Sequence, residues 1–491
     1  MTEKDSEASE TQPKETDSML ELGTDSESLL SGGFEGRSHS FSKRSSTEEA
    51  LGHGHHESFQ TTASNSTTEE RTLSRSQLVQ LFLFSFGNGI LLSSYFIVTL
   101  PIESKRISKE KSAAILGGFI FVAGVTQLVN PVVGLLSDRC LHRWGRRRPF
   151  IFYGALAGLV GLFFQLVGRY AEWWMLYLLA FIVSMLALNV IYSCMNGLIA
   201  DLVPEKQIGQ ANGMIAMLNV CGAVSSFAVF RILGDLNLFY MFYILCIAFT
   251  AAGTFNMAGQ LENSFHKEDS QFYRKGLSTV WQDLKSAFYL SPTEHRDFFF
   301  ILVSRTLYYM GVSSQCFLMY YIRDTLHISE EESENVTSLL AVVGQFFGIL
   351  TAFPVGYISD RLSNGRKGYV YISCAIMATG NLAFIFVETQ MTIIAITCTI
   401  GAANGAYLTM DGALAFDALP NKEEAARFMG IWGIGAFVGT ALGPLIGGPL
   451  LMTQYNEDGT GYSTFGYGML LTLSALYLSG SALTLTGTTV S

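Results

Sequence analysis

Residues 134–149 carry the pattern that decides the fold: Gly134-Leu-Leu-Ser-Asp138-Arg139 and, shortly after it, Arg143-Trp-Gly145-Arg146-Arg147-Arg148-Pro149. The pattern begins at the end of one apolar run and finishes at the start of the next. A second copy lies in the second half of the chain, as Gly356-Tyr-Ile-Ser-Asp360-Arg361 and Gly365-Arg366-Lys367, in the same setting. An acidic residue that closes a hydrophobic helix and a basic cluster that opens the next one, present twice, indicate a membrane protein built by duplication.

The composition indicates that most of the chain faces something other than water. The 491 residues are 49% hydrophobic and 15% charged, against roughly 25% charged residues in soluble domains. Much of the acid behind the net charge of -10 lies in residues 1–74, which are rich in Ser, Thr and Glu. This segment has too few apolar residues to offset the entropy of folding, so we predict a disordered cytosolic tail. No apolar stretch follows a basic start, so the tail does not resemble a cleaved signal peptide.

Twelve apolar runs after residue 75 are long enough to cross a hydrocarbon layer, which takes about 20 mainly apolar residues. The first six are expected at 76–98, 113–136, 150–168, 173–198, 208–231 and 238–259. The last six are expected at 298–322, 336–358, 368–388, 391–416, 427–451 and 464–485. The sequence therefore predicts an all-α integral membrane protein with twelve transmembrane helices.

The duplication extends beyond the loop motif. Asp201-Leu-Val-Pro204 ends the fourth predicted helix, and Asp417-Ala-Leu-Pro420 ends the tenth, at a spacing close to that of the two loop motifs. We therefore expect two pseudo-symmetric six-helix bundles, at 75–260 and 298–485, joined by a cytosolic loop at 261–297 and followed by a short tail at 486–491. A parallel repeat of this kind places a ligand site between the bundles, near the bilayer midplane.

The orientation follows from the short loops that hold Lys and Arg. On one side of the predicted bundle lie Arg143–Arg148, Lys267–Lys275, Arg361–Lys367 and Lys422–Arg427. The positive-inside rule makes that side cytosolic and puts both termini there. The other side has an acidic loop, with Glu330, Glu331, Glu332 and Glu334, and a first loop that opposes the rule, with Lys105, Arg106, Lys109 and Lys111. An outer loop also carries the glycosylation sequon Asn335-Val-Thr337, close to the eighth predicted helix.

The loop pattern G-x-x-x-D-R-x-x-x-x-x-G-R-R-R resembles the loop between the second and third helices of the major facilitator superfamily. The longer string RWGRRRPF, at 143–150, resembles the plant sucrose transporters and their relatives, which carry glycosides with protons. The similarity covers about residues 75–485. Plant sucrose transporters have an acidic residue midway along helix four and an arginine near its cytoplasmic end, whereas this chain has Met185 and Asn196 there. The second half resembles microbial and eukaryotic relatives with R-x-x-Y-Y-M-G in helix seven and an Asp in helix ten, so a coupling carboxylate is expected at Asp411.

The two loop motifs are interpreted as a cytoplasmic gate. Gly134 is expected to let helices approach closely, and Asp138 to accept from the first turn of a neighbouring helix and pair with Arg139 or Arg146. Such contacts hold one side of the bundle shut in one conformation. The alternative is that the arginines only set topology and bind anionic headgroups. The predicted gate comprises Gly134, Asp138, Arg139, Gly145, Arg146, Arg147, Gly356, Asp360, Arg361, Gly365 and Arg366.

Two charged residues lie within predicted spans, where ionisable groups are costly and mark function. Arg305 is in helix seven and Asp411 in helix ten. At 1.5 Å per residue, both lie on the order of 10 Å in from the cytosolic ends of their helices. Helices seven and ten line the cavity in the superfamily that this chain resembles, so we expect the pair to face the cavity and each other. An Asp whose Arg partner comes and goes alternately releases and takes up a proton. A permanent ion pair and a hydrated carboxylate stay open as alternatives.

Neutral side chains complete the candidate site. Amide groups have donors and acceptors that suit sugar hydroxyls, and aromatic faces suit sugar rings. Each such residue alone fits a helix-packing role as well, so the prediction rests on the group. The candidates for substrate binding are Asn88, Gln127, Asn189, Asn196, Gln315, Gln345, Asn404 and Tyr308, with Asn130, Tyr95, Tyr192 and Tyr309 beside them.

The tail contains two smaller signals. Asp25, Leu29 and Leu30 fit the acidic dileucine pattern D-x-x-x-L-L, which adaptors recognise in endosomal, lysosomal or vacuolar sorting. His53-Gly-His-His56 lacks a fourth ligand and a fold, so no metal site is predicted.

The leading hypothesis is a secondary active transporter that moves a small sugar or glycoside by alternating access, coupled to protons. An uncoupled carrier or exporter of another polar solute, and a non-transporting membrane sensor, remain alternatives. An enzyme is not predicted, because the sequence has no recognisable nucleophile, metal-ligand cluster or phosphate-binding loop. We expect no cofactor and no nucleic acid; the expected partners are the substrate, protons, lipid and sorting adaptors. The expected location is the plasma membrane or an endosomal, lysosomal or vacuolar membrane.

Overall fold

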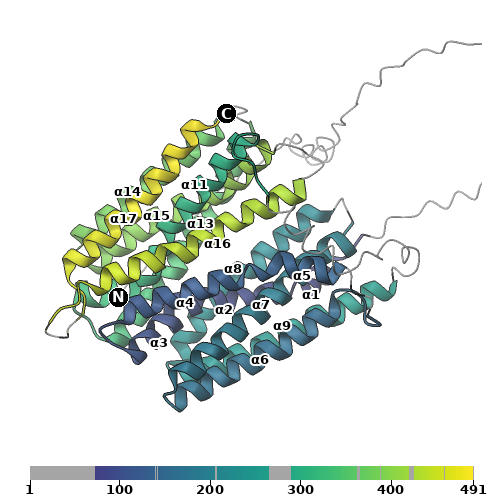
Figure 1. Ribbon diagram of the computed structural model, residues 1–491, viewed down its shortest axis with the longest axis horizontal. Helices are drawn as coiled ribbons and strands as arrows, with labels where there is room; N and C mark the ends of the chain where they lie inside the picture. The colour runs from purple at the N-terminus through teal and green to yellow at the C-terminus, as the bar shows by residue number, and fades with distance from the viewer. Residues whose placement is uncertain are drawn as a thin grey trace, which may run out of the picture. The chain divides into compact units, whose positions relative to one another are not determined.

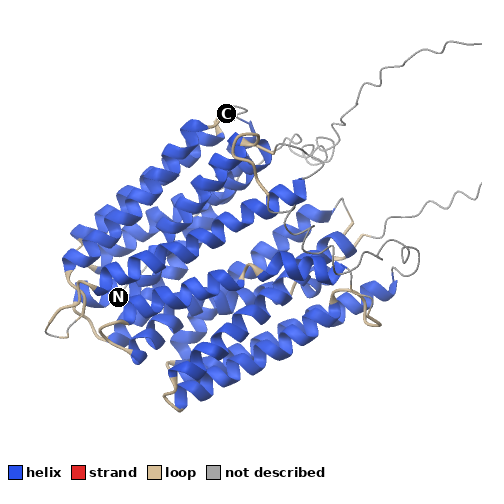
Figure 2. Cartoon of the chain, in the orientation of Figure 1, coloured by secondary structure: helices blue, strands red, loops and turns tan. Residues whose placement is uncertain are grey.

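The computed structural model describes residues 72–138, 140, 142–204, 207–264, 289–361, 365–387, 389–419, 425–457, 459 and 461–489. All of them belong to one unit, Glu69–Ser491. They form helices and loops, with one isolated bridge between Tyr455 and Tyr462 (Figure 2). The predicted sorting signal at Asp25, Leu29 and Leu30 and the histidines at 53–56 lie outside the described residues.

The first half of the chain forms one group of helices (Figure 1). Its elements are α1 (Arg75–Leu81), α2 (Phe84–Ser94), the π-helical turn η1 (Tyr95–Thr99), α3 (Leu100–Ile107), α4 (Ser112–Thr126), α5 (Val129–Asp138), α6 (Arg148–Tyr170), α7 (Trp174–Leu202), α8 (Ile208–Leu233) and α9 (Leu236–Ser264). The first of them begins at Ser74, whose hydroxyl and the side chain of Gln77 form a capping box.

The second half forms the other group. Its elements are α11 (Arg296–Val312), the 3-10 turn η4 (Ser313–Phe317), α12 (Leu318–Leu326), α13 (Glu330–Arg361), α14 (Arg366–Ala383), η5 (Phe384–Phe386), α15 (Gln390–Asp417), α16 (Ala425–Met452), α17 (Thr464–Thr484) and η7 (Leu485–Gly487). The halves meet where α16 packs on α4 and α13 on α8 (Figure 1).

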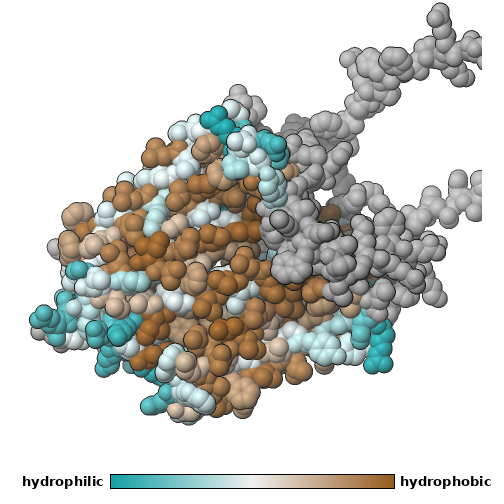
Figure 3. All heavy atoms as spheres, in the orientation of Figure 1, coloured by the Kyte–Doolittle hydropathy of each residue, from teal (hydrophilic) through white to brown (hydrophobic). Residues whose placement is uncertain are grey.

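In the described part of the chain, eleven helices are long and apolar enough to cross a membrane. The predicted span at 298–322 is present as α11, η4 and α12, and the 3-10 turn divides it into shorter helices. Large apolar side chains such as Leu179, Leu245 and Phe249 are exposed along the helices. In the view of Figure 3, apolar residues cover most of the helix length and polar residues gather toward the helix ends. The protein is thus a multi-pass integral membrane protein.

Two sequence-based expectations about outer loops are wrong. Glu330–Glu334 form the first residues of α13, because Ser329 Oγ accepts the N–H of Glu332 at 3.2 Å and begins the helix. Carboxylates near a helix N-terminus are favoured by the helix dipole. Asn335 also lies within α13, and Thr337 is buried and donates to the carbonyl of Ser333. The sequon is therefore helical rather than part of a loop.

Candidate functional site

An ion-pair network fixes the first loop motif, at what we call the motif end of the bundle, where α5 and α7 end and α6 begins. Arg147 lies 2.6 Å from Asp138 and 2.7 Å from Asp201. Arg146 also pairs with Asp201. Arg147 is only 6% exposed, and Ser137 Oγ accepts from its guanidinium at 2.9 Å. The structure thus pairs Asp138 with Arg147, a partner that the sequence did not predict. Arg139 lies outside the described residues.

The second loop motif repeats part of this network. Arg366, at the start of α14, lies 2.9 and 2.8 Å from the two carboxylate oxygens of Asp417, at the end of α15. This pair stands where Arg146 and Asp201 stand in the first half. Its carboxylate is more exposed, at 37% for Asp417 against 10% for Asp201, whereas Arg366 at 27% is slightly less exposed than Arg146 at 34%. The side chains of Asp360 and Arg361 lie outside the described part.

The glycines of the motifs differ in what surrounds them. Gly145 has a φ of 97°, in the left-handed region, and an added Cβ would overlap the Glu262 carboxylate. An added Cβ at Gly356 would touch Thr409 of α15, whereas at Gly134 or Gly365 it would meet none of the described residues. The expected close helix approach at Gly134 is thus absent from this conformation. The reason is that the described part of the second half stands clear of α5 at this position.

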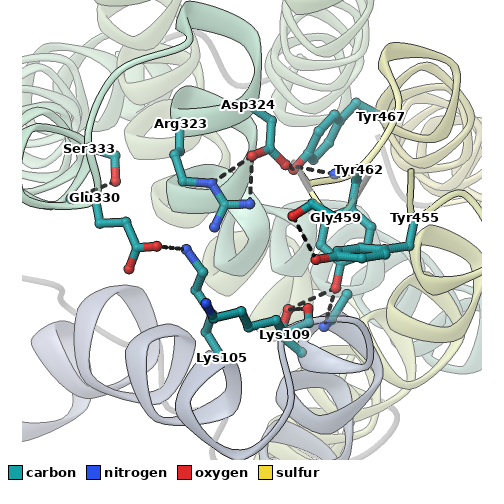
Figure 4. Close-up of polar contacts among 12 residues, drawn as sticks. Lys105, Lys109, Arg323, Asp324, Glu330, Ser333, Tyr455, Gly459, Tyr462 and Tyr467 are labelled. Atoms are coloured by element: carbon teal, nitrogen blue, oxygen red, sulfur yellow. Dashed lines mark hydrogen bonds and ion pairs between the residues drawn. The ribbon is translucent and has the colours of Figure 1, made fainter. Parts of the chain in front are cut away.

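The two halves are joined at the opposite end of the bundle, where α3 ends and α13 begins (Figure 4). Lys105 of α3 forms an ion pair with Glu330 of α13. The Tyr320 hydroxyl of α12 donates to the carbonyl of Pro101 in α3 at 2.7 Å. The basic residue that opposes the positive-inside rule therefore has an acidic partner in the other half.

A tyrosine from the loop between α16 and α17 adds to this closure. The Tyr462 hydroxyl accepts the N–H of Ala113 at 2.9 Å and bonds with the Ser112 hydroxyl at 2.8 Å. Asp324 holds the loop in place, because its carboxylate accepts the Tyr462 N–H at 2.9 Å and the Tyr467 hydroxyl at 2.7 Å (Figure 4). In the described conformation, the end of the bundle opposite the motifs is therefore closed.

Arg305 of α11 and Asp411 of α15 form an ion pair inside the second half. Arg305 is 7% exposed and Asp411 4% exposed. The guanidinium carbon lies 3.4 Å from the ring centroid of Trp432 on α16 and 4.9 Å from that of Tyr309. The structure therefore brings the two intramembrane charges together, within an aromatic setting.

A second aromatic contact lies beside this pair. The rings of Tyr308 and Tyr407 stack with centroids 3.3 Å apart and planes 2° from parallel. The Tyr308 hydroxyl donates to the Asn404 side-chain oxygen. A continuous polar and aromatic strip therefore connects the ion pair with the amide of Asn404.

Three of the predicted substrate-binding residues line one cavity. Gln315 from η4, Gln345 from α13 and Asn404 from α15 face it together with Asn381 of α14, and Ile97 of η1 reaches it from the first half. Thr397 also lines it, and its buried hydroxyl oxygen has no partner in the described part of the chain. Such a lining offers several hydrogen-bonding groups and apolar walls to a small polar ligand.

Both halves interrupt a helix beside this cavity. The π-helical turn η1 begins at Tyr95 and the 3-10 turn η4 begins at Ser313, so the two turns are spaced along the chain much as the other repeats are. The two turns contact each other. Because irregular turns within membrane helices occur frequently at functional sites, this position strengthens the cavity as a candidate binding site.

The remaining predicted residues lie elsewhere in the first half. The Asn189 amide donates to Thr126 Oγ1 of α4 at 3.1 Å, a contact between helices. Tyr95 is buried and bonds with Gln165. Four others do not line the described cavity: Asn88 is buried in α2, and Gln127, Asn196 and Tyr192 are half-buried.

Sequence reasoning missed Trp432, Asn381 and Thr397. Trp432 is a large indole within a glycine-rich apolar run, Met429-Gly-Ile-Trp-Gly433, and that contrast in size was an available signal. Asn381 and Thr397 belong to the same class of intramembrane polar groups as the predicted amides. Their register on α14 and α15 decides that they face the cavity.

Comparisons with known proteins agree with this architecture. The family model described as Major Facilitator Superfamily matches residues 78–291 and 301–487. Lactose permease of Lactobacillus helveticus is 25% identical over 136 residues, which cover 25% of this chain and 21% of that protein. The general alpha-glucoside permease of Schizosaccharomyces pombe is 32% identical over 150 residues, which cover 26% of this chain and 27% of that protein.

Solved structures resemble the chain over a greater length. A crystal structure of the nucleoside transporter NupG is 15% identical and superposes with a TM-score of 0.62, over 84% of this chain and 98% of that one. At this identity the likeness is one of fold. The matches to the two permeases span only 21% and 27% of those proteins' own lengths.

Proposed function

This chain belongs to the Major Facilitator Superfamily, and from that membership we propose that it is a secondary active transporter for a small sugar or glycoside, coupled to protons. The observation that carries the proposal is the convergence of Gln315, Gln345 and Asn404 on one cavity beside η1 and η4. Membership of a transporter superfamily agrees with the expectation that the chain is not an enzyme.

The amides support a sugar as the substrate class. Each amide offers two donors and an acceptor, which match hydroxyl groups that donate and accept at once. Tyr308 donates to Asn404 and so leaves the amide nitrogen of Asn404 available to a ligand. Two of the relatives are named as permeases for lactose and alpha-glucosides. The string RWGRRRPF adds a resemblance to the sucrose transporter branch.

The pair Arg305–Asp411 supports proton coupling. A guanidinium beside a carboxylate favours the ionised carboxylate, and a buried carboxylate without that partner favours its protonated form. If the distance between α11 and α15 changes during the transport cycle, Asp411 takes up a proton in one conformation and releases it in the other. Among the described residues, this is the ion pair that lies deepest within the predicted spans.

The location and orientation rest on charge. The arginines of the motif end make that end cytosolic, with both termini, by the positive-inside rule. We keep the domain limits given by the sequence, namely a tail at 1–74, a central loop at 261–297 and bundles at 75–260 and 298–485. The dileucine pattern at Asp25, Leu29 and Leu30 makes adaptor-dependent sorting to an endosomal, lysosomal or vacuolar membrane part of the proposal.

One observation favours a second candidate, an uncoupled carrier of a polar solute. Arg305 lies between the rings of Trp432 and Tyr309 while it pairs with Asp411, which is an arrangement that also suits a permanent structural tether. In that case the carboxylate stays ionised throughout the cycle, and transport follows the solute gradient alone.

Uptake by reconstituted vesicles separates these functions. Purified protein is tested with radiolabelled sucrose, maltose and lactose, with and without an imposed pH gradient, and protein-free vesicles serve as the control. Accumulation of a sugar only under the gradient supports the proposal. Equal uptake without the gradient supports the uncoupled carrier. Absence of flux and counterflow for every sugar contradicts the assigned substrate class.

A further inference from the structure

Trp432 is the large aromatic side chain of α16 that lies against the ion pair. Its indole ring covers the Arg305 guanidinium, with 3.4 Å between the guanidinium carbon and the ring centroid. Tyr309 lies on the same cation at 4.9 Å. A guanidinium that stacks on an aromatic face is held in orientation by the ring's negative quadrupole. The position of α16 therefore influences how Arg305 is presented to Asp411.

Hydrogen bonds to the described residues do not fix the whole orientation of the Arg305 guanidinium. Arg305 Nε and Trp432 Nε1 are both buried, and neither has a hydrogen-bond partner in the part of the chain that the structure describes. Arg305 reaches Asp411 through Nη1. Since no described acceptor fixes Nε, the rings of Trp432 and Tyr309 restrain the guanidinium, and Trp432 is the closer of the two.

The helix that carries Trp432 lies between the ion pair and the interface of the two halves. An added Cβ at Gly439 would overlap the Thr306 carbonyl of α11, so α16 packs tightly on the helix of Arg305. On another face, an added Cβ at Gly448 would overlap the Ala113 carbonyl of α4, in the first half. Close-packed interfaces shift between discrete arrangements, so we expect α16 to change its position on α11 when its contact with α4 changes.

We infer that Trp432 is a positioning residue, through which the movement of α16 against α4 sets the contact between Arg305 and Asp411. This inference rests on the proposed proton coupling at Asp411. In the described conformation the indole holds Arg305 on the carboxylate. When α16 tilts, the indole moves off the guanidinium, the ion pair loosens and Asp411 accepts a proton from the cavity. The charge pair and the gate thus change together.

Among the described residues, few other titratable groups surround the pair. Those near it are Tyr308 and Tyr309 on α11, Tyr407 on α15 and Cys374 on α14. Phenols and a buried thiol stay neutral around pH 7. A pH response between about 5 and 8 that depends on Trp432 is therefore assigned to Asp411 and not to these neighbours.

The test needs no known substrate. A single reporter cysteine replaces Ser333, which is 2% exposed and lines a cavity between α3 and α13 at the end opposite the motifs. The reporter is placed in the 491-residue chain without its seven native cysteines. Labelling by a membrane-impermeant maleimide is measured against pH in vesicles. Trp432→Leu removes the aromatic face, and Trp432→Phe keeps a smaller one. Trp174→Leu is the matched control, since Trp174 begins α7 and is 49% exposed.

We expect the midpoint of the pH dependence to rise by about one pH unit in Trp432→Leu. Trp432→Phe should shift it by less, and Trp174→Leu should leave it unchanged. An unchanged midpoint in both Trp432 variants overturns the inference. If Trp432→Leu does not fold, the Trp432→Phe midpoint decides alone. Asp411→Asn tells the two proposals apart: if it keeps the wild-type pH dependence, the coupling at Asp411 fails, whatever the Trp432 variants do.

Discussion

Lys105 at the end of α3 and Glu330 at the start of α13 form an ion pair between the two halves of the bundle. Lys105 belongs to a basic segment that opposes the positive-inside rule, on the side predicted to be non-cytosolic, and Glu330 belongs to a row of acids at a helix start. Because Lys105 pairs with Glu330, the two segments are complementary in charge. The pair marks the end at which the described conformation is closed, and the arginines of the loop motifs mark the other.

Reversing one of these charges should weaken the closure. Lys105→Glu and Glu330→Lys each place like charges across the interface, and the double reversal restores attraction. Glu330 is 65% exposed, so solvent screening limits the pair to about 1 kcal/mol or less, a change of up to roughly fivefold in the conformational populations. Maleimide labelling of a cysteine at Ser333, which is buried in the described conformation, measures this change. Single variants that label like the wild type at low salt, where screening is weakest, would remove the pair from the gate.

The ion pairs of the two loop motifs predict that loss of the carboxylate destabilises the protein more at Asp201 than at the symmetric Asp417. Asp201 is 10% exposed and holds both Arg146 and Arg147, whereas Asp417 is 37% exposed and holds Arg366. Asp201→Asn should therefore lower the free energy of unfolding by about 3 kcal/mol, because it leaves the buried Arg147 guanidinium short of a partner. Asp417→Asn should cost less than about 1 kcal/mol. Thermal unfolding of the purified proteins, followed by size-exclusion fluorescence, compares them. Equal losses of stability in Asp201→Asn and Asp417→Asn would contradict the ion-pair network assigned to the first motif.

The sequence predicts the helices well because a membrane span is fixed by length and hydropathy, which are local properties. The helix that contains Arg305 was predicted as continuous, yet η4 interrupts it. That turn packs against η1, which belongs to the first half of the chain. Sequence spacing placed Arg305 and Asp411 at equal depth, but only the structure shows the indole of Trp432 on the guanidinium. The rotation of each helix about its own axis is set by contacts with distant parts of the chain, so local sequence patterns do not predict it.

Gln345 and Gln127 form a matched pair for testing the cavity. Both were predicted from sequence to bind substrate, but only Gln345 lines the cavity. Gln345→Leu should raise the KM for sugar about two- to tenfold, because it removes one hydrogen-bond partner worth about 0.5–1.5 kcal/mol. Gln127→Leu should leave KM within about twofold of the wild type. Uptake kinetics in vesicles give both values. A larger effect at Gln127 would move the binding site toward α4.

Gly134 offers a test of alternating access that is independent of substrate. An added Cβ at this position has no described atom within 4 Å, so we expect Gly134→Leu to keep the described conformation intact. If closing the motif end brings α5 against the other half, the same side chain then clashes, at a cost of about 1–3 kcal/mol. We expect at least a fivefold drop in labelling at a Ser333 cysteine, which is buried in the described conformation, with unchanged thermal stability. Unaltered labelling means that α5 stays clear of the other half at Gly134 throughout the cycle.

Asp411 decides the coupling. Asp411→Asn keeps the size and hydrogen-bonding capacity of the side chain but cannot exchange a proton. We therefore expect the variant to lose accumulation of sugar driven by a pH gradient and to retain counterflow, in which labelled sugar exchanges with unlabelled sugar. Arg305→Ala should be more harmful, because it leaves Asp411, which is 4% exposed, buried without its cation and in favour of its protonated form.

The two variants also separate coupling from a structural tether. A tether predicts that Asp411→Asn either fails to fold or transports with the wild-type pH dependence, since an ion pair that never opens exchanges no proton. Thermal unfolding of the purified variant identifies the first case, and uptake at a series of pH values identifies the second. An Asp411→Asn protein that still concentrates sugar in response to a pH gradient would show that the proton binds elsewhere. The coupling residue would then have to be sought outside α11 and α15, because Arg305 is the described charge partner of Asp411.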